Sequence, residues 1–241
     1  MRPVRTLVPF KLDGAKSRLS PVLSPEERAI LAMSMLKDVL DAVSSTCAGG
    51  VTILFKPGCM SLRRQGIMAE VRESSLELND AINSFLEEWA DMGWPSDVLI
   101  AMSDLALLGP DEVRGVLETE GDIVLSPGRG GGTNLILIRD PRFRTCYHGL
   151  SFPKHIDFCR RAGMRAGMYD SYFTGCDIDE PEDLGEVLIH SRGRSKEILR
   201  KMGFALSENG RAGCIRITNR MGKASDRGTH PLGCPLTSSN K

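Results

Sequence analysis

The chain has 241 residues and equal numbers of basic and acidic side chains, 31 of each, so its formal net charge is zero. This balance argues against binding to nucleic acid or to an anionic membrane surface through overall charge. Hydrophobic residues make up 41% of the chain, which is enough for a core, but no apolar run reaches the roughly 20 residues of a membrane helix. We therefore expect one α/β domain, or two small ones.

The N-terminus and the cysteines both suggest a cytoplasmic protein. The first ten residues lack the long apolar segment of a signal peptide and lead directly into a predicted strand. The seven cysteines include no CxxC pair, so we expect free thiols and no zinc site. No cysteine is assigned a catalytic role.

The first predicted element is a short strand over residues 7–10 that runs into a basic loop. The loop carries Lys11, Lys16 and Arg18 around Gly14. A strand followed by a glycine-containing basic loop and a helix is one way in which α/β folds bind phosphate, because cations and backbone N–H groups converge there. An ordinary basic surface loop is the alternative, and the spacing alone does not separate the two.

Strands and helices then alternate along the chain. The clearest helix begins at Pro25, with Ser24 as its N-cap and Glu27 completing a capping box. The alternation predicts an α/β fold with a mixed, mostly parallel sheet between layers of helices. The patterns predict strands over 51–55, 69–71, 98–102, 122–125, 134–138, 163–169 and 177–179, and helices over 25–43, 75–89, 110–117, 151–161, from 181 onward and over 195–202.

The composition changes at Ser207. Gly, Ser, Asn and Arg dominate from there to the end, and apolar periodicity is lost. We expect a folded domain over residues 1–206 and a flexible basic tail over 207–241. The alternative is an arm that becomes ordered on a partner or on an anionic substrate.

Three aspartates follow predicted strands or lie in them. Asp104 comes directly after an apolar strand, where it suits a metal ligand or a turn residue. Asp177 and Asp179 would share one face of an extended segment, with carboxylates roughly 6–7 Å apart. At a dielectric of about 20 their repulsion is about 2.5 kcal/mol, which a divalent cation would relieve, whereas a solvated loop would make it small. Mg²⁺ prefers carboxylates together with substrate phosphates, so the pattern indicates a nucleoside triphosphate site with magnesium.

A glycine-rich turn over residues 127–133 precedes the strand at 134–138. It either binds a second anion through its N–H groups or forms a plain hairpin turn, and it is neither a Walker A nor a Rossmann sequence. Thr133 lies at its exit. His148 and Ser151 precede the next helix, where Ser151 suits an N-cap better than a phosphate ligand.

The ordered set of motifs resembles the 2-phospho-L-lactate guanylyltransferase family, which acts in the biosynthesis of coenzyme F420. The segments are VPFK, AKSRLSPVLSPEER, LND, SDLALL, GGTN, HGLSF and DIDEPEDL, and they cover about residues 5–188. The family is similar to a wider group of nucleotidyltransferases with a mixed α/β sheet, which includes the molybdenum cofactor guanylyltransferases. The resemblance implies attack of a 2-phospho-L-lactate oxygen on the α-phosphorus of GTP, with pyrophosphate leaving.

The resemblance also implies a role for each matching residue. Lys16, Arg18 and Asp104 would be catalytic, and a homodimer is expected. The chain departs from the family pattern at Ala106, Glu180, Glu77 and His148, and the last change puts one acceptor contact in doubt. The implied nucleotide ligands are Lys11, Lys16, Arg18, Leu78 and Asn79. The implied ligands of the acceptor are Thr133, His148 and Ser151. The implied ligands of two Mg²⁺ ions are Asp104, Asp177 and Asp179.

Other functions stay open from the sequence. The same chemistry on phosphoenolpyruvate or 3-phosphoglycerate differs by small groups worth only about 1–3 kcal/mol. A sugar-phosphate or molybdopterin nucleotidyltransferase would keep the fold, although the chain lacks a GxGxR-type opening. A nucleotide-binding regulator without chemistry would need fewer carboxylates near a triphosphate.

Overall fold

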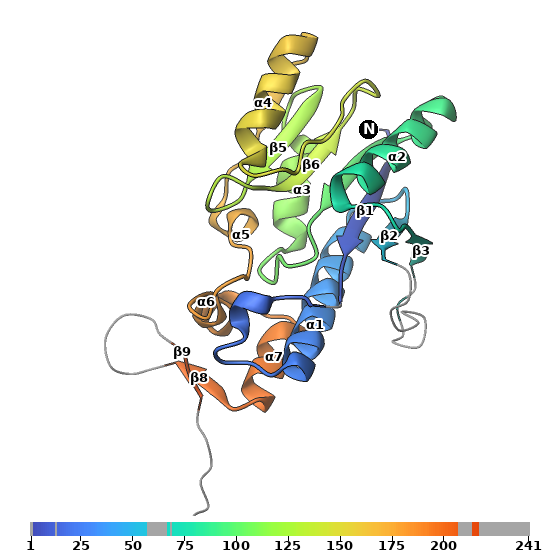
Figure 1. Ribbon diagram of the computed structural model, residues 1–241. Coiled ribbons are helices and arrows are strands. Elements are labelled where there is room, and N and C mark those ends of the chain that lie inside the picture. Colours follow the sequence, from blue (N-terminus) through green and yellow to red (C-terminus); the bar gives the residue numbers. More distant parts are fainter. Residues whose placement is uncertain (1, 13, 57–66, 68, 207–213, 217–241) are drawn as a thin grey trace, which may run out of the picture.

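A seven-stranded mixed sheet forms the centre of the molecule (Figure 1). This computed structural model describes residues 2–12, 14–56, 67, 69–206 and 214–216. The strand order is β3-β2-β1-β4-β6-β5-β7, and every neighbouring pair is parallel except β4/β6 and β5/β6. The predicted fold class is therefore confirmed. The strands are β1 Val4–Phe10, β2 Val51–Phe55, β3 Glu70–Glu73, β4 Asp97–Ala101, β5 Ile123–Pro127, β6 Thr133–Ile138 and β7 Ala166–Met168.

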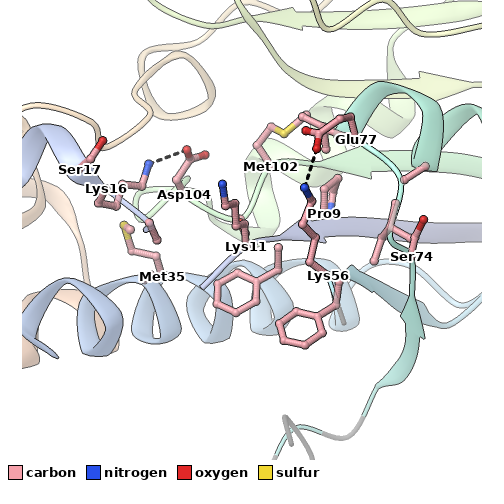
Figure 2. Close-up of a pocket in the computed structure, with 18 of the residues that line it drawn as sticks. Pro9, Lys11, Lys16, Ser17, Met35, Lys56, Ser74, Glu77, Met102 and Asp104 are labelled. Atoms are coloured by element: carbon pink, nitrogen blue, oxygen red, sulfur yellow. Dashed lines mark hydrogen bonds and ion pairs between the residues drawn. The ribbon is translucent and has the colours of Figure 1, made fainter. Parts of the chain in front are cut away.

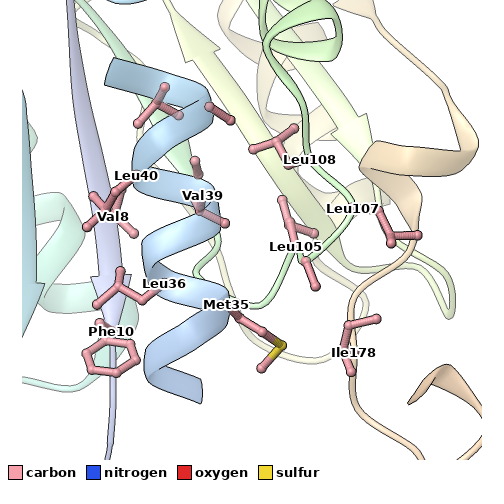
Figure 3. Close-up of a cluster of buried hydrophobic side chains, with 14 of the residues drawn as sticks. Val8, Phe10, Met35, Leu36, Val39, Leu40, Leu105, Leu107, Leu108 and Ile178 are labelled. Atoms are coloured by element: carbon pink, nitrogen blue, oxygen red, sulfur yellow. The ribbon is translucent and has the colours of Figure 1, made fainter. Parts of the chain in front are cut away.

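Helices cover both faces of this sheet. One hydrophobic cluster joins β1 to α1, α3, α6 and α7, and a second joins the opposite face to α2 and α4. Figure 3 shows Leu36 and Leu40 of α1 facing Val8 and Phe10 of β1. The helices are α1 Pro25–Ser44, α2 Leu78–Asp91, α3 Pro110–Glu118, α4 Ser151–Ala162, α5 Tyr172–Gly175, α6 Asp183–His190 and α7 Arg194–Lys201, with a 3₁₀ turn at Ser17–Leu19.

Helix α1 forms as its sequence predicts. The Ser24 side chain accepts a hydrogen bond from Glu27 N, and the Glu27 carboxylate accepts one from Ser24 N. This capping box satisfies two of the N–H groups that a helix start leaves without partners. The far half of α1 is tied to α7 by buried Asp38, which accepts hydrogen bonds from Arg194 N and from Ser195 N and Oγ.

Three predictions about elements are wrong, two of them helix starts and one a strand. Helix α2 begins at Leu78 and not at residue 75, because Glu77 is extended and Ser74 N donates to Phe55 O beside β2. Residues 177–179 form no strand, and α6 begins at Asp183 and not at 181. In the segment 177–179, Ile178 N donates to Asp104 O and Asp179 N donates to the Asp183 side chain. No sheet neighbour therefore pairs with this segment.

The C-terminal part of the described chain adds a small hairpin. Strand β8, Phe204–Leu206, pairs antiparallel with β9, Cys214–Arg216. Strand β9 lies within the stretch that the sequence predicts as a flexible tail, while residues 207–213 and 217–241 lie outside the described residues. Within the described helices, none is long and apolar enough to cross a membrane.

Candidate active site

The basic loop and Asp104 meet because β1 and β4 are parallel neighbours. Leu7 lies beside Ile100 in the register of the two strands. Their carboxyl ends therefore reach the same edge of the sheet, which is where open α/β sheets bind ligands. The loop after β1 carries Lys16 and Arg18, and the loop after β4 carries Asp104.

Lys16 lies at the centre of this cluster. Its Nζ donates to Asp104 Oδ2 and to Asp179 Oδ1, both at 2.7 Å (Figure 2 shows the Asp104 contact). Arg18 lies 3.6 Å from Asp179 Oδ2. Burial acts to lower the pKa of Lys16, but the charges of Asp104 and Asp179 outweigh it and raise that pKa above the ordinary value of lysine. The sequence-predicted cations and acids are therefore brought together.

Lys16 also has an uncommon backbone. Its φ and ψ angles are 53° and 43°, the left-handed region that non-glycine residues rarely adopt. Such a conformation costs on the order of 1–3 kcal/mol and is typical of ligand-binding sites. The two short ion pairs of the side chain offset this cost.

Asp177 approaches the cluster along the segment after α5. Ile178 N donates to Asp104 O at 3.2 Å, which aligns residues 177–179 with the end of β4. Burial, and then the charge of Asp104, raise the pKa of Asp177 above the usual range. Asp104 Oδ1 and Asp177 Oδ1 are both buried and have no hydrogen-bond partner among the described residues.

The predicted three-aspartate metal site is not preformed. Across the described chain, no three His, Cys, Asp or Glu side chains are grouped so that they could hold a metal ion. Asp179 instead pairs with Lys16 and Arg18. The unpartnered oxygens of Asp104 and Asp177 still fit a hard cation, because Mg²⁺ is commonly held by one or two carboxylates and completed by substrate phosphates.

Two residues that the sequence did not single out hold the acidic segment in place. Asp183 accepts hydrogen bonds from Asp179 N at 2.8 Å and Glu180 N at 2.7 Å. Arg129, in the glycine-rich turn, donates to Asp183 Oδ1 at 2.5 Å and to Asp177 O at 2.9 Å. The turn between β5 and β6 is therefore a hairpin turn whose arginine fixes the backbone around Asp177 and Asp179.

A pocket of ≈350 Å³ opens beside the cluster. Lys11, Lys16, Arg18, Asp104 and Asp179 contribute to its lining. This volume lies within the range of small-molecule sites, about 300–1,000 Å³. A pocket with cations, carboxylates and apolar walls suits an anionic ligand with an apolar part.

Only one of the two predicted nucleotide residues at the start of α2 lines this pocket. Leu78 does so and is 41% exposed. The Asn79 side chain instead accepts hydrogen bonds from Tyr147 N at 3.0 Å and Thr145 Oγ1 at 3.2 Å. It fixes the segment before α4.

The predicted acceptor residues separate into a buried pair and an exposed residue. Thr133 Oγ1 and Ser151 Oγ are 3.1 Å apart and nearly inaccessible, whereas His148 is exposed. Leu150 is the N-cap of α4, so the expectation that Ser151 caps this helix is wrong. The sequence did not single out His155, which is buried beside Thr133. Its Nδ1 lies 2.9 Å from Thr133 Oγ1, and its Nε2 accepts a hydrogen bond from Cys146 N. Because Nε2 is an acceptor, Nδ1 carries the proton of the neutral ring.

We expect His155 to make stability depend on pH. Burial lowers the pKa of His155 from 6.5 to about 4. As the pH falls, the unfolded chain therefore protonates at His155 before the folded protein does. The contribution of His155 to stability is lost between pH 6.5 and about 4, and His155 causes no further loss below that range. The shift corresponds to about 3 kcal/mol. Urea unfolding across this range should show a steeper loss for wild type than for His155→Gln, and equal slopes would contradict the prediction.

The sequence matches a known protein family over most of its length. The family model described as "Guanylyl transferase CofC like" matches residues 4–220. The 2-phospho-L-lactate guanylyltransferase of Methanothrix thermoacetophila is 49% identical over 209 residues, which is 87% of this chain and 94% of the relative. The enzyme of the same name from Methanosarcina barkeri is 40% identical and covers 89% of this chain and 100% of the relative.

Solved structures support the same fold. A crystal structure from Desulfovibrio desulfuricans G20 superposes with a TM-score of 0.67 and 19% identity, over 83% of this chain and 95% of that one. The structure of 4-diphosphocytidyl-2C-methyl-D-erythritol synthase gives a TM-score of 0.53 and 11% identity, over 78% and 99%. At these identities the likeness concerns the fold alone.

Proposed function

Because the chain belongs to the CofC-like guanylyl transferase family, we propose that it transfers GMP from GTP to 2-phospho-L-lactate. A phosphate oxygen of the acceptor attacks the α-phosphorus of GTP, and the bond from that phosphorus to the bridging oxygen of the β-phosphate breaks. The products are lactyl-2-diphospho-5′-guanosine and pyrophosphate, a step of coenzyme F420 biosynthesis. Such a reaction asks the protein chiefly to align the two phosphates and to neutralise charge.

The observation that carries the proposal is the position of Lys16 between Asp104 and Asp179 at the edge of the pocket. We assign Lys11, Lys16 and Arg18 to the triphosphate. Lys16 has two roles in this assignment, because its ammonium neutralises the carboxylates in the free protein and is then available to the phosphates.

Magnesium is part of the proposal. Asp104 and Asp177 would hold it through their unpartnered oxygens, and Asp179 is assigned to the same group. When bound, Mg²⁺ would offset charge on the reacting phosphates. We propose two ions, as the family resemblance implies.

The acceptor is assigned to the start of β6 and the start of α4. Met102 N donates to Asn134 O at 3.1 Å, so Thr133 and Asn134 lie beside the segment that leads to Asp104. The linked hydroxyls of Thr133 and Ser151 are assigned to the acceptor phosphate, and His148 to the edge of that site. Both hydroxyls are buried, so residues around them would have to move before an acceptor could reach them.

The wider setting of the enzyme is also a proposal. We take it to act in the cytoplasm as a homodimer on small molecules, without nucleic acid or membrane partners. The resemblance to the family supports the dimer, and the zero net charge supports the absence of polyanionic partners.

The test is pyrophosphate release from GTP and Mg²⁺ with 2-phospho-L-lactate, phosphoenolpyruvate and 3-phosphoglycerate in separate reactions. We expect release with the first acceptor at the highest kcat/KM, and none without an acceptor. Release with another of these acids at a higher kcat/KM would reassign the acceptor. No release with any of them would overturn the proposal.

A further inference from the structure

The end of the pocket away from Asp104 carries a second pair of opposite charges. Lys56, directly after β2, and Glu77, directly before α2, lie 2.7 Å apart between Nζ and Oε1. Figure 2 shows this pair at one end of the pocket and the Lys16–Asp104 pair at the other, with Lys11 between them. If the phosphates of a nucleotide bind near Lys11 and Lys16, its base reaches the Lys56–Glu77 end.

The fold does not depend on this ion pair. The side chains of Lys56 and Glu77 are 41% and 77% exposed. Exposed ion pairs contribute little to stability, so a ligand can take over their contacts at small cost. Glu77 is also the N-cap residue of α2, yet its side chain makes no capping hydrogen bond. Its carboxylate lies in the pocket lining and pairs with Lys56.

The surroundings of the pair suit a flat, partly apolar ring. Leu54, Ala81 and Met102 line the same pocket. Leu76 and Leu78, on either side of Glu77, are 47% and 41% exposed and also line it. A planar base placed here would cover apolar surface that the free protein leaves open to water.

We propose that Lys56 and Glu77 select guanine, an inference that rests on the proposed use of GTP. Guanine presents the O6 acceptor beside two donors, N1–H and the N2 amino group, and adenine presents a donor and an acceptor in the reverse order. The Lys56 ammonium donates to O6, and the Glu77 carboxylate accepts from N1–H and from the N2 amino group. Adenine would place its N6 amino group at the ammonium and its N1 lone pair at the carboxylate.

The two side chains can be tested separately with three nucleotides. Binding of GTP, ITP and ATP with Mg²⁺ is measured by calorimetry without an acceptor, so no turnover occurs. ITP keeps O6 and N1–H but lacks the N2 amino group. We expect wild type to bind ITP about tenfold more weakly than GTP, which is the loss of one charge-assisted hydrogen bond. ATP should bind more weakly still.

The variants should lose different parts of this preference. Glu77→Gln should weaken GTP by roughly ten- to hundredfold and bring the GTP and ITP affinities close together, with little change for ATP. Lys56→Met should weaken GTP and ITP by the same factor, because both carry O6. Glu120→Gln, which removes an exposed carboxylate paired with Arg165 on another part of the surface, is the matched control and should leave all three affinities unchanged.

The inference would be overturned if Glu77→Gln and Lys56→Met kept the wild-type order and ratios of GTP, ITP and ATP. Both residues are on the surface of the pocket, so circular dichroism spectra matching wild type are expected for each variant. Failure of the proposed function is a separate result: wild type would then neither bind GTP nor release pyrophosphate from it.

Discussion

Replacing Lys16 by methionine is expected to lower kcat/KM for GTP by about a thousandfold, or ~4 kcal/mol of transition-state stabilisation. Methionine keeps most of the length and the apolar stem of lysine and removes only the ammonium. That ammonium is the group that reaches both Asp104 and Asp179, at 2.7 Å each. In the proposed reaction it is also one of the three cations assigned to the triphosphate, so its loss affects charge neutralisation in the transition state directly.

The same substitution should have the opposite effect on cation binding in the absence of nucleotide. Without the Lys16 ammonium, Asp104 and Asp179 lose the positive charge that now neutralises them. We therefore expect Mn²⁺, measured by its electron paramagnetic resonance signal, to bind Lys16→Met more tightly than wild type. Lys196→Met, at a lysine that contacts only Ile189 O among the contacts described, is the control for both measurements. Turnover within threefold of wild type would refute the role of Lys16.

The fold could be predicted from the sequence because local signals determine most of it. The Ser24–Glu27 capping box and the apolar run at residues 51–55 lie at the positions that the structure shows for α1 and β2. The sequence also predicts the segment at 177–179 as a strand that carries Asp177 and Asp179. Its hydrogen bonds instead go to Asp104 O and Asp183, partners that no local pattern reveals.

The candidate site was predictable to the extent that strand ends define it. Lys16 follows β1 and Asp104 follows β4, and pairing of these two strands brings both residues to one edge. Arg129 and His155 carried no comparable signal. Each acts through a contact with a residue more than 20 positions away, Arg129 with Asp183 and His155 with Thr133. Such contacts arise from the tertiary fold, and a single sequence does not record them.

Asp177→Asn should separate activity from stability. We expect turnover to fall by about a thousandfold or more, because an amide replaces a carboxylate assigned to Mg²⁺. The amide has nearly the same shape as the carboxylate, and Arg129 can still donate to the backbone oxygen of residue 177, so the backbone there should be retained. Pyrophosphate release at saturating GTP and acceptor, over a series of Mg²⁺ concentrations, measures the effect, and added Mg²⁺ should not restore the rate.

The stability of Asp177→Asn should change in the other direction. Burial and the charge of Asp104 raise the pKa of Asp177, so its ionised form is disfavoured in the folded protein. At neutral pH the charged carboxylate therefore destabilises the free protein, and the neutral amide should raise the free energy of unfolding. This gain should shrink as the pH falls through the raised pKa, because the folded protein then binds the proton that removes the charge.

The combination of lower activity with higher stability is what distinguishes a functional carboxylate from a structural one. A residue kept for packing or hydrogen bonding would lose stability on substitution, whereas a charge kept for ligand binding lowers the stability of the free protein. Asp170→Asn, at an exposed aspartate nearby in the chain, should change neither quantity. If Asp177→Asn were less stable than wild type at pH 7 and still active, Asp177 would have a structural role, and the assignment of Mg²⁺ to the Asp104–Asp177 pair would fail.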